Sequence, residues 1–146
     1  MKALIIEDEP HAQQELMRLL QKTDPGISIV DVLPSIREAV KWFKKHEEPD
    51  IIFMDIMLSD GESFEILKDV DIQSPIIFTT AYNEHALKAF KHNSIDYLLK
   101  PVDPVDLRRA LTKLKNLTNK LTERSQINLN RKYYMYTYTL ARRETN

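Results

Sequence analysis

Residues 50–61 read DIIFMDIMLSDG, and this stretch decides the fold class. It opens with a nearly continuous apolar run, 50–54, that stops at the carboxylate of Asp55. A run of this kind is typical of a strand covered by helices on both faces, as in parallel sheets. The stretch therefore predicts a buried strand with an acidic residue at its carboxyl end.

Four further apolar runs predict strands, and helical stretches lie between them. The strands are expected at 2–7, 27–33, 75–79 and 95–99. Two helices are expected from apolar stripes with three- and four-residue spacing. The first stripe is Ala12, Leu16, Leu19 and Leu20, and the second is Ile36, Ala39, Val40 and Phe43. Three more helices are expected near 62–70, 83–92 and 104–122. Strands that alternate with helices indicate βα units with right-handed crossovers. We therefore expect a doubly wound α/β fold, a three-layer sandwich around a five-stranded parallel sheet.

The composition is that of a globular protein. The 146 residues are the size of one ordinary domain, and 42% of them are hydrophobic and 29% charged. No apolar run approaches the ~20 residues that a membrane-spanning helix needs. The apolar start of the chain runs directly into Glu7, Asp8 and Glu9 and lacks the pattern of a secretory signal. We expect a cytoplasmic protein with no membrane partner, and the absence of cysteine excludes disulfides and Cys-ligated zinc.

The net charge of −1 conceals an acidic body and a basic end. Residues 1–106 carry 11 Lys and Arg against 20 Asp and Glu, whereas residues 107–146 carry 10 against 2. Two interpretations remain open for the basic segment. It is either a solvated helix face and tail, or it lies near nucleic acid or an acidic partner.

Polar side chains interrupt the predicted strands where four of them end. Glu7 and Asp8 follow the first strand, Asp55 the third, Thr80 the fourth and Lys100 the fifth. Ligands of such sheets bind outside the carboxyl ends of the strands, so these side chains should converge. Each alone has an ordinary role, such as a helix cap or a surface lysine. Their joint placement at four strand ends indicates a functional site.

This set of side chains suits Mg²⁺ and phosphoryl chemistry. Carboxylates that are packed together repel one another, so they must bind a cation or shift their protonation. Oxygen ligands without His or Cys favour Mg²⁺, which keeps positions for water and phosphate oxygens. An aspartate can then attack a phosphorylated donor and form an acyl phosphate. The metal and a lysine would neutralise charge on the transferred group.

Four segments resemble a known family: MKALIIEDEP (1–10), DIIFMDIMLSDG, PIIFTTAY (75–82) and DYLLKP (96–101). They look like the hallmark segments of the receiver domains of two-component response regulators, and they occur in the same order. The resemblance covers residue 1 to about residue 122 and implies a flavodoxin-like fold with the strand order 2-1-3-4-5. The run TTAYNEHALKAFKHNSIDYLLKP (79–101) further resembles receivers that precede a LytTR-type DNA-binding domain, the LytR/AlgR-like subfamily.

The resemblance implies a role for each residue of the site. Asp55 would be the phosphoacceptor, and Lys100 would contact the phosphoryl group. Asp8 would be a direct Mg²⁺ ligand, Glu7 an outer-shell acid, and the backbone carbonyl of Met57 a further metal ligand. The donor would be a sensor histidine kinase. The chain would thus be a signalling receiver that assists its own phosphorylation and dephosphorylation rather than an enzyme with a separate substrate.

The resemblance also implies how the signal leaves the site. Thr80 would bind the phosphoryl group and, with Tyr97, form a switch pair. The Lys100–Pro101 bond is expected to be cis, an isomer found in only ~5% of X-Pro bonds in folded proteins. The switch would change the face built from the fourth helix, the fifth strand and the fifth helix. That face is expected to form a phosphorylation-promoted homodimer.

The loop after Asp55 departs from the family pattern. Many relatives carry Pro where Ser59 stands and Gly where Ser63 stands, whereas the turn glycine here is Gly61. We therefore expect this loop to follow a somewhat different path from that of its relatives.

The chain is expected to divide into a receiver at 1–122 and a basic linker or tail at 123–146. The tail does not resemble the start of a LytTR domain, so the output domain is expected to be absent or truncated. DNA would be contacted only through that missing domain. A stand-alone phosphorelay carrier remains an alternative. A phosphatase of the haloacid dehalogenase type is disfavoured, because that family needs an acid where Met57 stands.

Overall fold

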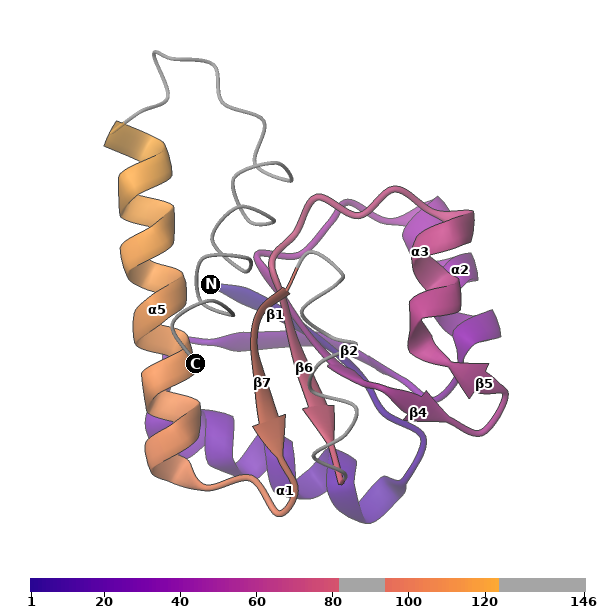
Figure 1. The fold of residues 1–146 in the computed structure, drawn as a ribbon, viewed down its shortest axis with the longest axis horizontal. Coiled ribbons are helices and arrows are strands. Elements are labelled where there is room, and N and C mark those ends of the chain that lie inside the picture. Colours follow the sequence, from indigo (N-terminus) through magenta and orange to yellow (C-terminus); the bar gives the residue numbers. More distant parts are fainter. Residues whose placement is uncertain (82–93, 124–146) are drawn as a thin grey trace, which may run out of the picture.

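The computed structural model describes residues 1–81 and 94–123 (Figure 1). Five strands form the main sheet: β1 (Lys2–Ile6), β2 (Ser28–Leu33), β3 (Ile51–Asp55), β6 (Ile76–Thr80) and β7 (Ser94–Leu99). The other elements are α1 (Pro10–Thr23), α2 (Ile36–Lys45), β4 (Met57–Leu58), β5 (Gly61–Glu62), the 3₁₀ turn η1 (Ser63–Glu65), α3 (Ile66–Asp69) and α5 (Pro104–Glu123). The helix expected at 83–92 and most of the predicted tail lie outside the described residues.

All strands of the main sheet are parallel and follow the order β2-β1-β3-β6-β7. This is the predicted order 2-1-3-4-5, because β4 and β5 pair only with each other in a separate antiparallel hairpin. The fold class predicted from the sequence is therefore confirmed.

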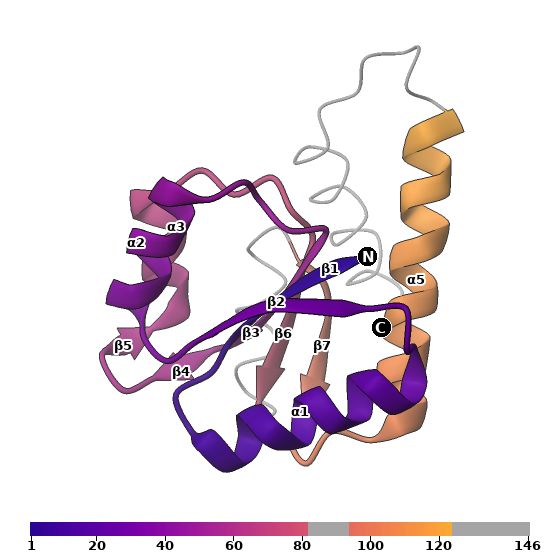
Figure 2. The ribbon, with the colours of Figure 1, turned by 180° about the vertical axis from the view of Figure 1, so that it is seen from behind.

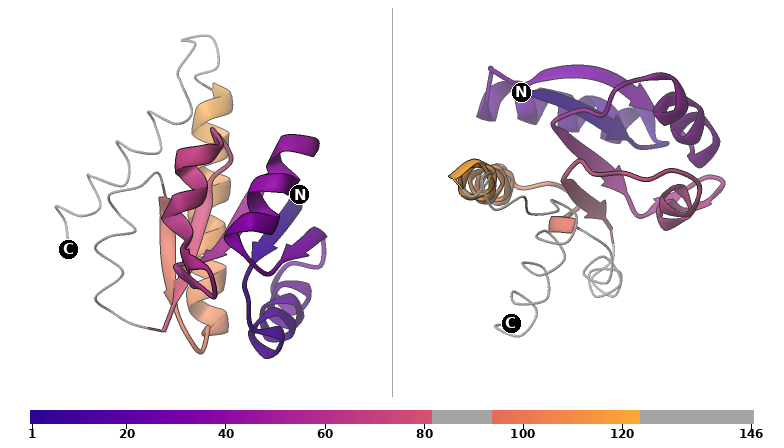
Figure 3. Two further views of the ribbon diagram at one scale, coloured as in Figure 1. Left: turned by 90° about the vertical axis from the view of Figure 1, so that its right-hand side faces the viewer. Right: turned by 90° about the horizontal axis from the view of Figure 1, so that it is seen from above.

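Helices cover both faces of the sheet, as Figures 2 and 3 show. On one face, alternate strand residues pack against α1 and α5; this cluster includes Ala3, Ile5, Phe53, Ile77, Leu16, Leu20, Leu107 and Leu114. On the other face, the intervening residues pack against α2 and α3; this cluster includes Leu4, Ile6, Met54, Phe78, Ala39, Trp42 and Ile66. Burial on both faces explains why the central strands are apolar without interruption.

The segment predicted as a helix over 62–70 has a different structure. Gly61 and Glu62 form β5, a 3₁₀ turn follows, and the α-helix is only the four residues Ile66–Asp69. Gly61 has a φ of 136°, which glycine adopts readily and other residues rarely adopt. The backbone N–H of Ser63 also donates to the carbonyl of Ile56 at 2.8 Å. Because of these two features, the segment begins as part of the β4–β5 hairpin, and the α-helix begins only at Ile66.

The register of the strands brings their carboxyl ends to one edge. Asp55 of β3 lies opposite Thr79 of β6, and Thr80 lies opposite Leu99 of β7. The residues that follow β1 and β7 leave the sheet at the same edge. The sheet therefore positions the predicted site before any side chain is considered.

Candidate functional site

Three acids meet at this edge of the sheet. Glu7 and Asp8 follow β1, and Asp55 is the last residue of β3. One carboxylate oxygen from each lies within 4.8 Å of the others. Glu7 and Asp55 are buried, with 4% and 7% of their surfaces exposed. The sequence prediction that these acids converge agrees with this geometry.

Lys100 completes the cluster from the end of β7. Its Nζ donates to Oδ2 of Asp55 at 2.9 Å and to Oε1 of Glu7. Burial by itself lowers the pKa of Lys100, but the hydrogen bonds to Asp55 and Glu7 and the charges of both outweigh it, and the pKa is raised. Lys100 therefore remains a cation between two buried acids.

Asp8 has a pKa above its ordinary value. Burial is the largest cause, followed by a hydrogen bond to Glu7 and the negative charge of that neighbour. The charged form of Asp8 is thus disfavoured by its protein surroundings, although Lys100 partly offsets this effect. A metal cation bound among these carboxylate oxygens would instead favour the charged form of Asp8. Clustered carboxylate oxygens are the ligands that Mg²⁺ prefers, so the residues present fit this metal.

Backbone contacts fix the orientation of the acids. The N–H of Met57 donates to Oδ1 of Asp55 at 3.2 Å, and the N–H of Glu9 donates to Oε2 of Glu7 at 3.1 Å. Gln13 of α1 donates through Nε2 to the backbone carbonyl of Glu7 at 2.6 Å. Gln13 is a supporting residue that the sequence analysis missed. Its place in the first turn of a helix is visible in the sequence, but that place does not reveal its partner.

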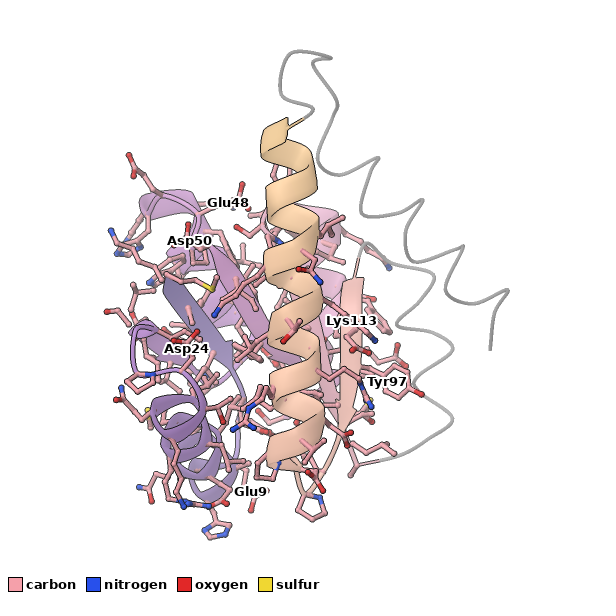
Figure 4. The ribbon with its side chains drawn as sticks, turned by 90° about the vertical axis from the view of Figure 1, so that its left-hand side faces the viewer. Glu9, Asp24, Glu48, Asp50, Tyr97 and Lys113 are labelled. Atoms are coloured by element: carbon pink, nitrogen blue, oxygen red, sulfur yellow. The ribbon has the colours of Figure 1, made fainter. Side chains whose placement is uncertain are left out.

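The remaining predicted residues lie around this cluster. Thr80 is buried at the end of β6, and its carbonyl accepts the N–H of Lys100 at 2.8 Å. The Lys100–Pro101 bond is cis, the expected isomer. Met57 begins the β4–β5 hairpin, and 42% of its surface is exposed. Tyr97 lies on β7 beside Phe78 and packs against the core cluster on the α2 side (Figure 4).

A groove opens beside Glu7 and Lys100. Its volume is about 550 Å³, and it runs between the start of α1 and the residues after β7. Glu7, Thr79 and Lys100 form its polar end, whereas Leu16 and Val102 contribute apolar surface. Of the three acids, only Glu7 lines this groove.

Over residues 3–112 the chain matches the family described as the response regulator receiver domain. The chain belongs to this family. The receiver is 36% identical over 129 residues to the sensory transduction protein LytT of Bacillus anthracis, covering 86% of this chain and 52% of that protein. It is 37% identical over 121 residues to the transcriptional regulatory protein BtsR of Salmonella typhi, covering 82% and 50%. The predicted family is thus confirmed, and relatives named LytT agree with the LytTR-type resemblance.

Solved structures support the same assignment. The response regulatory domain of protein mrkE from Klebsiella pneumoniae has a TM-score of 0.70 and 32% sequence identity, covering 82% of this chain and 99% of that chain. A two-component response regulator from Clostridium difficile has a TM-score of 0.67 and 28% identity, covering 82% and 98%. The chain spans about half the length of the curated relatives it matches. Within residues 1–81 and 94–123, none of the helices is long and apolar enough to cross a bilayer.

Proposed function

We propose that this receiver accepts a phosphoryl group on Asp55 from a sensor histidine kinase. The observation that carries the proposal is the convergence of Asp55 with two further acids and the ammonium of Lys100. An oxygen of Asp55 attacks the phosphorus of the donor phosphohistidine, the new O–P bond forms and the N–P bond breaks. The electron pair of the broken bond leaves with the imidazole. The product is an acyl phosphate on Asp55.

Each supporting residue has a separate part in this reaction. The Nζ of Lys100 lies 2.9 Å from Oδ2 of Asp55. Its positive charge stabilises the negative charge of the transferred phosphoryl group. The hydroxyl of Thr80 donates to a phosphoryl oxygen. Asp8, Asp55 and the carbonyl of Met57 would hold Mg²⁺, with Glu7 in its outer shell. When bound, the metal neutralises charge on the attacking and transferred oxygens.

The output of the receiver belongs to the same proposal. Phosphorylation shifts the balance between two conformations through Thr80 and Tyr97 rather than creating a new fold. The relatives named as transcriptional regulators support a role in transcription, with DNA contacted through an output domain outside the receiver. We place the receiver at 1–122 and assign 123–146 to a linker or tail. A stand-alone phosphorelay carrier is disfavoured, because the similar LytT and BtsR proteins are about twice as long as the matched region.

The proposal is tested by the mass of the chain after incubation with acetyl phosphate and Mg²⁺. We expect a gain of one phosphoryl group, with acetate as the leaving group. Asp55→Asn should abolish the gain because the amide oxygen is a poor nucleophile. Asp69→Asn is the matched control, since Asp69 is an exposed aspartate at the end of α3. Unchanged labelling of Asp55→Asn, or labelling that persists after chelation of the metal, would contradict the proposal.

A further inference from the structure

The hairpin that follows Asp55 is tied to helix α2 by a carboxylate. Asp60, in the turn between β4 and β5, accepts the backbone N–H of Ile36 at 3.0 Å through Oδ1. Its Oδ2 accepts the N–H of Arg37 at 3.2 Å. These are the first two amides of α2, and the first amides of a helix have no partner within it. Asp60 therefore joins two segments that are distant in the sequence.

Helix α2 also has an ordinary local cap that does not involve the hairpin. The Oγ of Ser35, the residue before the helix, accepts the N–H of Glu38 at 3.1 Å. The two caps act on the same helix end but differ in what they hold. Ser35 stabilises the helix alone, whereas Asp60 also stabilises the position of the hairpin.

The charge of Asp60 suits this contact. Burial raises the pKa of its carboxyl, but the hydrogen bonds from the backbone of Ile36 and Arg37 outweigh this, and the pKa is lowered. The positive end of the helix dipole favours a negative group at this position. The carboxylate therefore stays ionised and bound to the helix at neutral pH.

The tip of the hairpin also lies close to the first residue of α2. Gly61 has a φ of +136°, and a Cβ at this position would meet Cδ1 of Ile36 at 3.3 Å. Ile36 in turn packs against the core cluster on the α2 side. The turn is thus held to α2 by the two hydrogen bonds that Asp60 accepts, and its glycine leaves little room for a side chain beside Ile36.

Met57 lies between this turn and the phosphorylation site. Its N–H donates to Asp55, and across the hairpin it pairs with Glu62. The backbone around Met57 is therefore held at two points. One is the hydrogen bond to Asp55 of the sheet, and the other is the pair of hydrogen bonds from α2 to Asp60. We infer that Asp60 is a positioning residue for the metal centre, which holds the hairpin so that the carbonyl of Met57 faces the metal. This inference rests on the proposed function, in which that carbonyl is a ligand.

The test compares Asp60→Ala with Ser35→Ala in the full chain, using the Kd for Mg²⁺ from isothermal titration calorimetry. Both variants remove a cap from α2, so both should lower the Tm. Only Asp60→Ala should weaken Mg²⁺ binding, by ~10-fold, the lower end of the effect of losing a group that orients a metal ligand. Asp60→Asn keeps one acceptor oxygen and should give an intermediate Kd.

Two outcomes would overturn the inference while leaving the proposed function intact. If Asp60→Ala binds Mg²⁺ as the wild type does, Asp60 is only a helix cap. If Ser35→Ala weakens binding equally, the stability of α2 matters rather than the hairpin. Should Asp60→Ala fail to fold, Asp60→Asn decides the question, since a wild-type Kd for that variant with a lowered Tm contradicts the inference. A wild-type chain that binds no Mg²⁺ would contradict both the inference and the proposed function.

Discussion

Lys100 donates hydrogen bonds to Asp55 and Glu7, whereas Asp8 shares a hydrogen bond with Glu7. The ammonium of Lys100 thus lies beside a cluster of three acids. The raised pKa of Asp8 reflects its burial and the negative neighbour. At the scale of single residues, the arrangement that suits a metal is a source of repulsion when no metal is bound.

Asp8→Asn should therefore raise the Tm of the metal-free protein at pH 7 by a few degrees. The pKa of Asp8 is raised above 3.8, so the folded state holds this proton more tightly than the unfolded chain. The stability from Asp8 is then fully present below the unfolded pKa and is lost as pH rises through the folded pKa. At neutral pH the charge opposes folding, and a neutral amide removes that effect. Calorimetric unfolding in EDTA measures it.

Two conditions serve as controls for this variant. Saturating Mg²⁺ should raise the Tm of the wild type, because the metal binds the folded state, and should raise that of Asp8→Asn much less. Below pH 4 the advantage of the amide should shrink, because Asp8 is then protonated. A lower Tm for metal-free Asp8→Asn at pH 7 would show that the hydrogen bond to Glu7 outweighs the repulsion.

At the scale of elements, α5 is joined to the rest of the receiver by two ion pairs that differ in burial. Lys113 contacts Asp96 of β7 at 3.0 Å, with side chains 21% and 1% exposed. Lys115 contacts Asp24, after α1, at 2.9 Å, with side chains 54% and 22% exposed. Figure 4 shows Lys113 on the side of α5 that faces β7, and Asp24 on the opposite side.

Lys113→Met should destabilise the receiver far more than Lys115→Met. Removing Lys113 leaves the buried charge of Asp96 without this partner, a change that costs about 3 kcal/mol when a buried pair is broken. An exposed pair such as Lys115 with Asp24 contributes less than about 1 kcal/mol. Urea unfolding of both variants gives the two free energies. Equal losses would mean that the Lys113 pair is no more important than a surface ion pair.

At the scale of the whole molecule, the site lies at the carboxyl ends of the strands. Helix α5 lies beside β7, the last strand of the sheet (Figure 1). Beryllofluoride, which mimics the phosphoryl group, should therefore promote a dimer through the face that includes β7 and α5. Sedimentation velocity over a wide concentration range measures the mass. Asp55→Asn should stay at the mass of the untreated chain, because it cannot form the adduct.

A shortened chain, residues 1–123, tests the domain boundary in the same experiment. Helix α5 ends at Glu123 and contributes buried residues from Leu107 to Leu117 to the core, so a chain that keeps this helix whole should keep the fold. Dimerisation with beryllofluoride and the acetyl phosphate reaction should both persist. Loss of either would place part of the segment 124–146 within the functional receiver. An unchanged mass of the intact chain would instead contradict phosphorylation-driven dimerisation.

The sequence by itself determined the sheet and the chemical identity of the site. Apolar strands that alternate with helices leave few topologies open, and right-handed crossovers reduce them further. The carboxyl ends of parallel strands meet at one edge, so the acids after two strands and the lysine after a third had to converge. Asp55, Glu7 and Lys100 could thus be grouped from their positions alone.

Only the tertiary structure decided which residues support that site and how. Asp60 caps a helix that begins 24 residues earlier, Gln13 holds the carbonyl of Glu7, and Asp96 pairs with Lys113 of a later helix. Periodicity reports which face of an element is apolar, but it does not identify the partner of a polar side chain. The course of the hairpin at Gly61 likewise depends on the hydrogen bonds from Ile36 and Arg37 to Asp60, which join segments distant in the sequence. Such contacts are set by how the layers pack, because packing brings together groups that no local pattern relates.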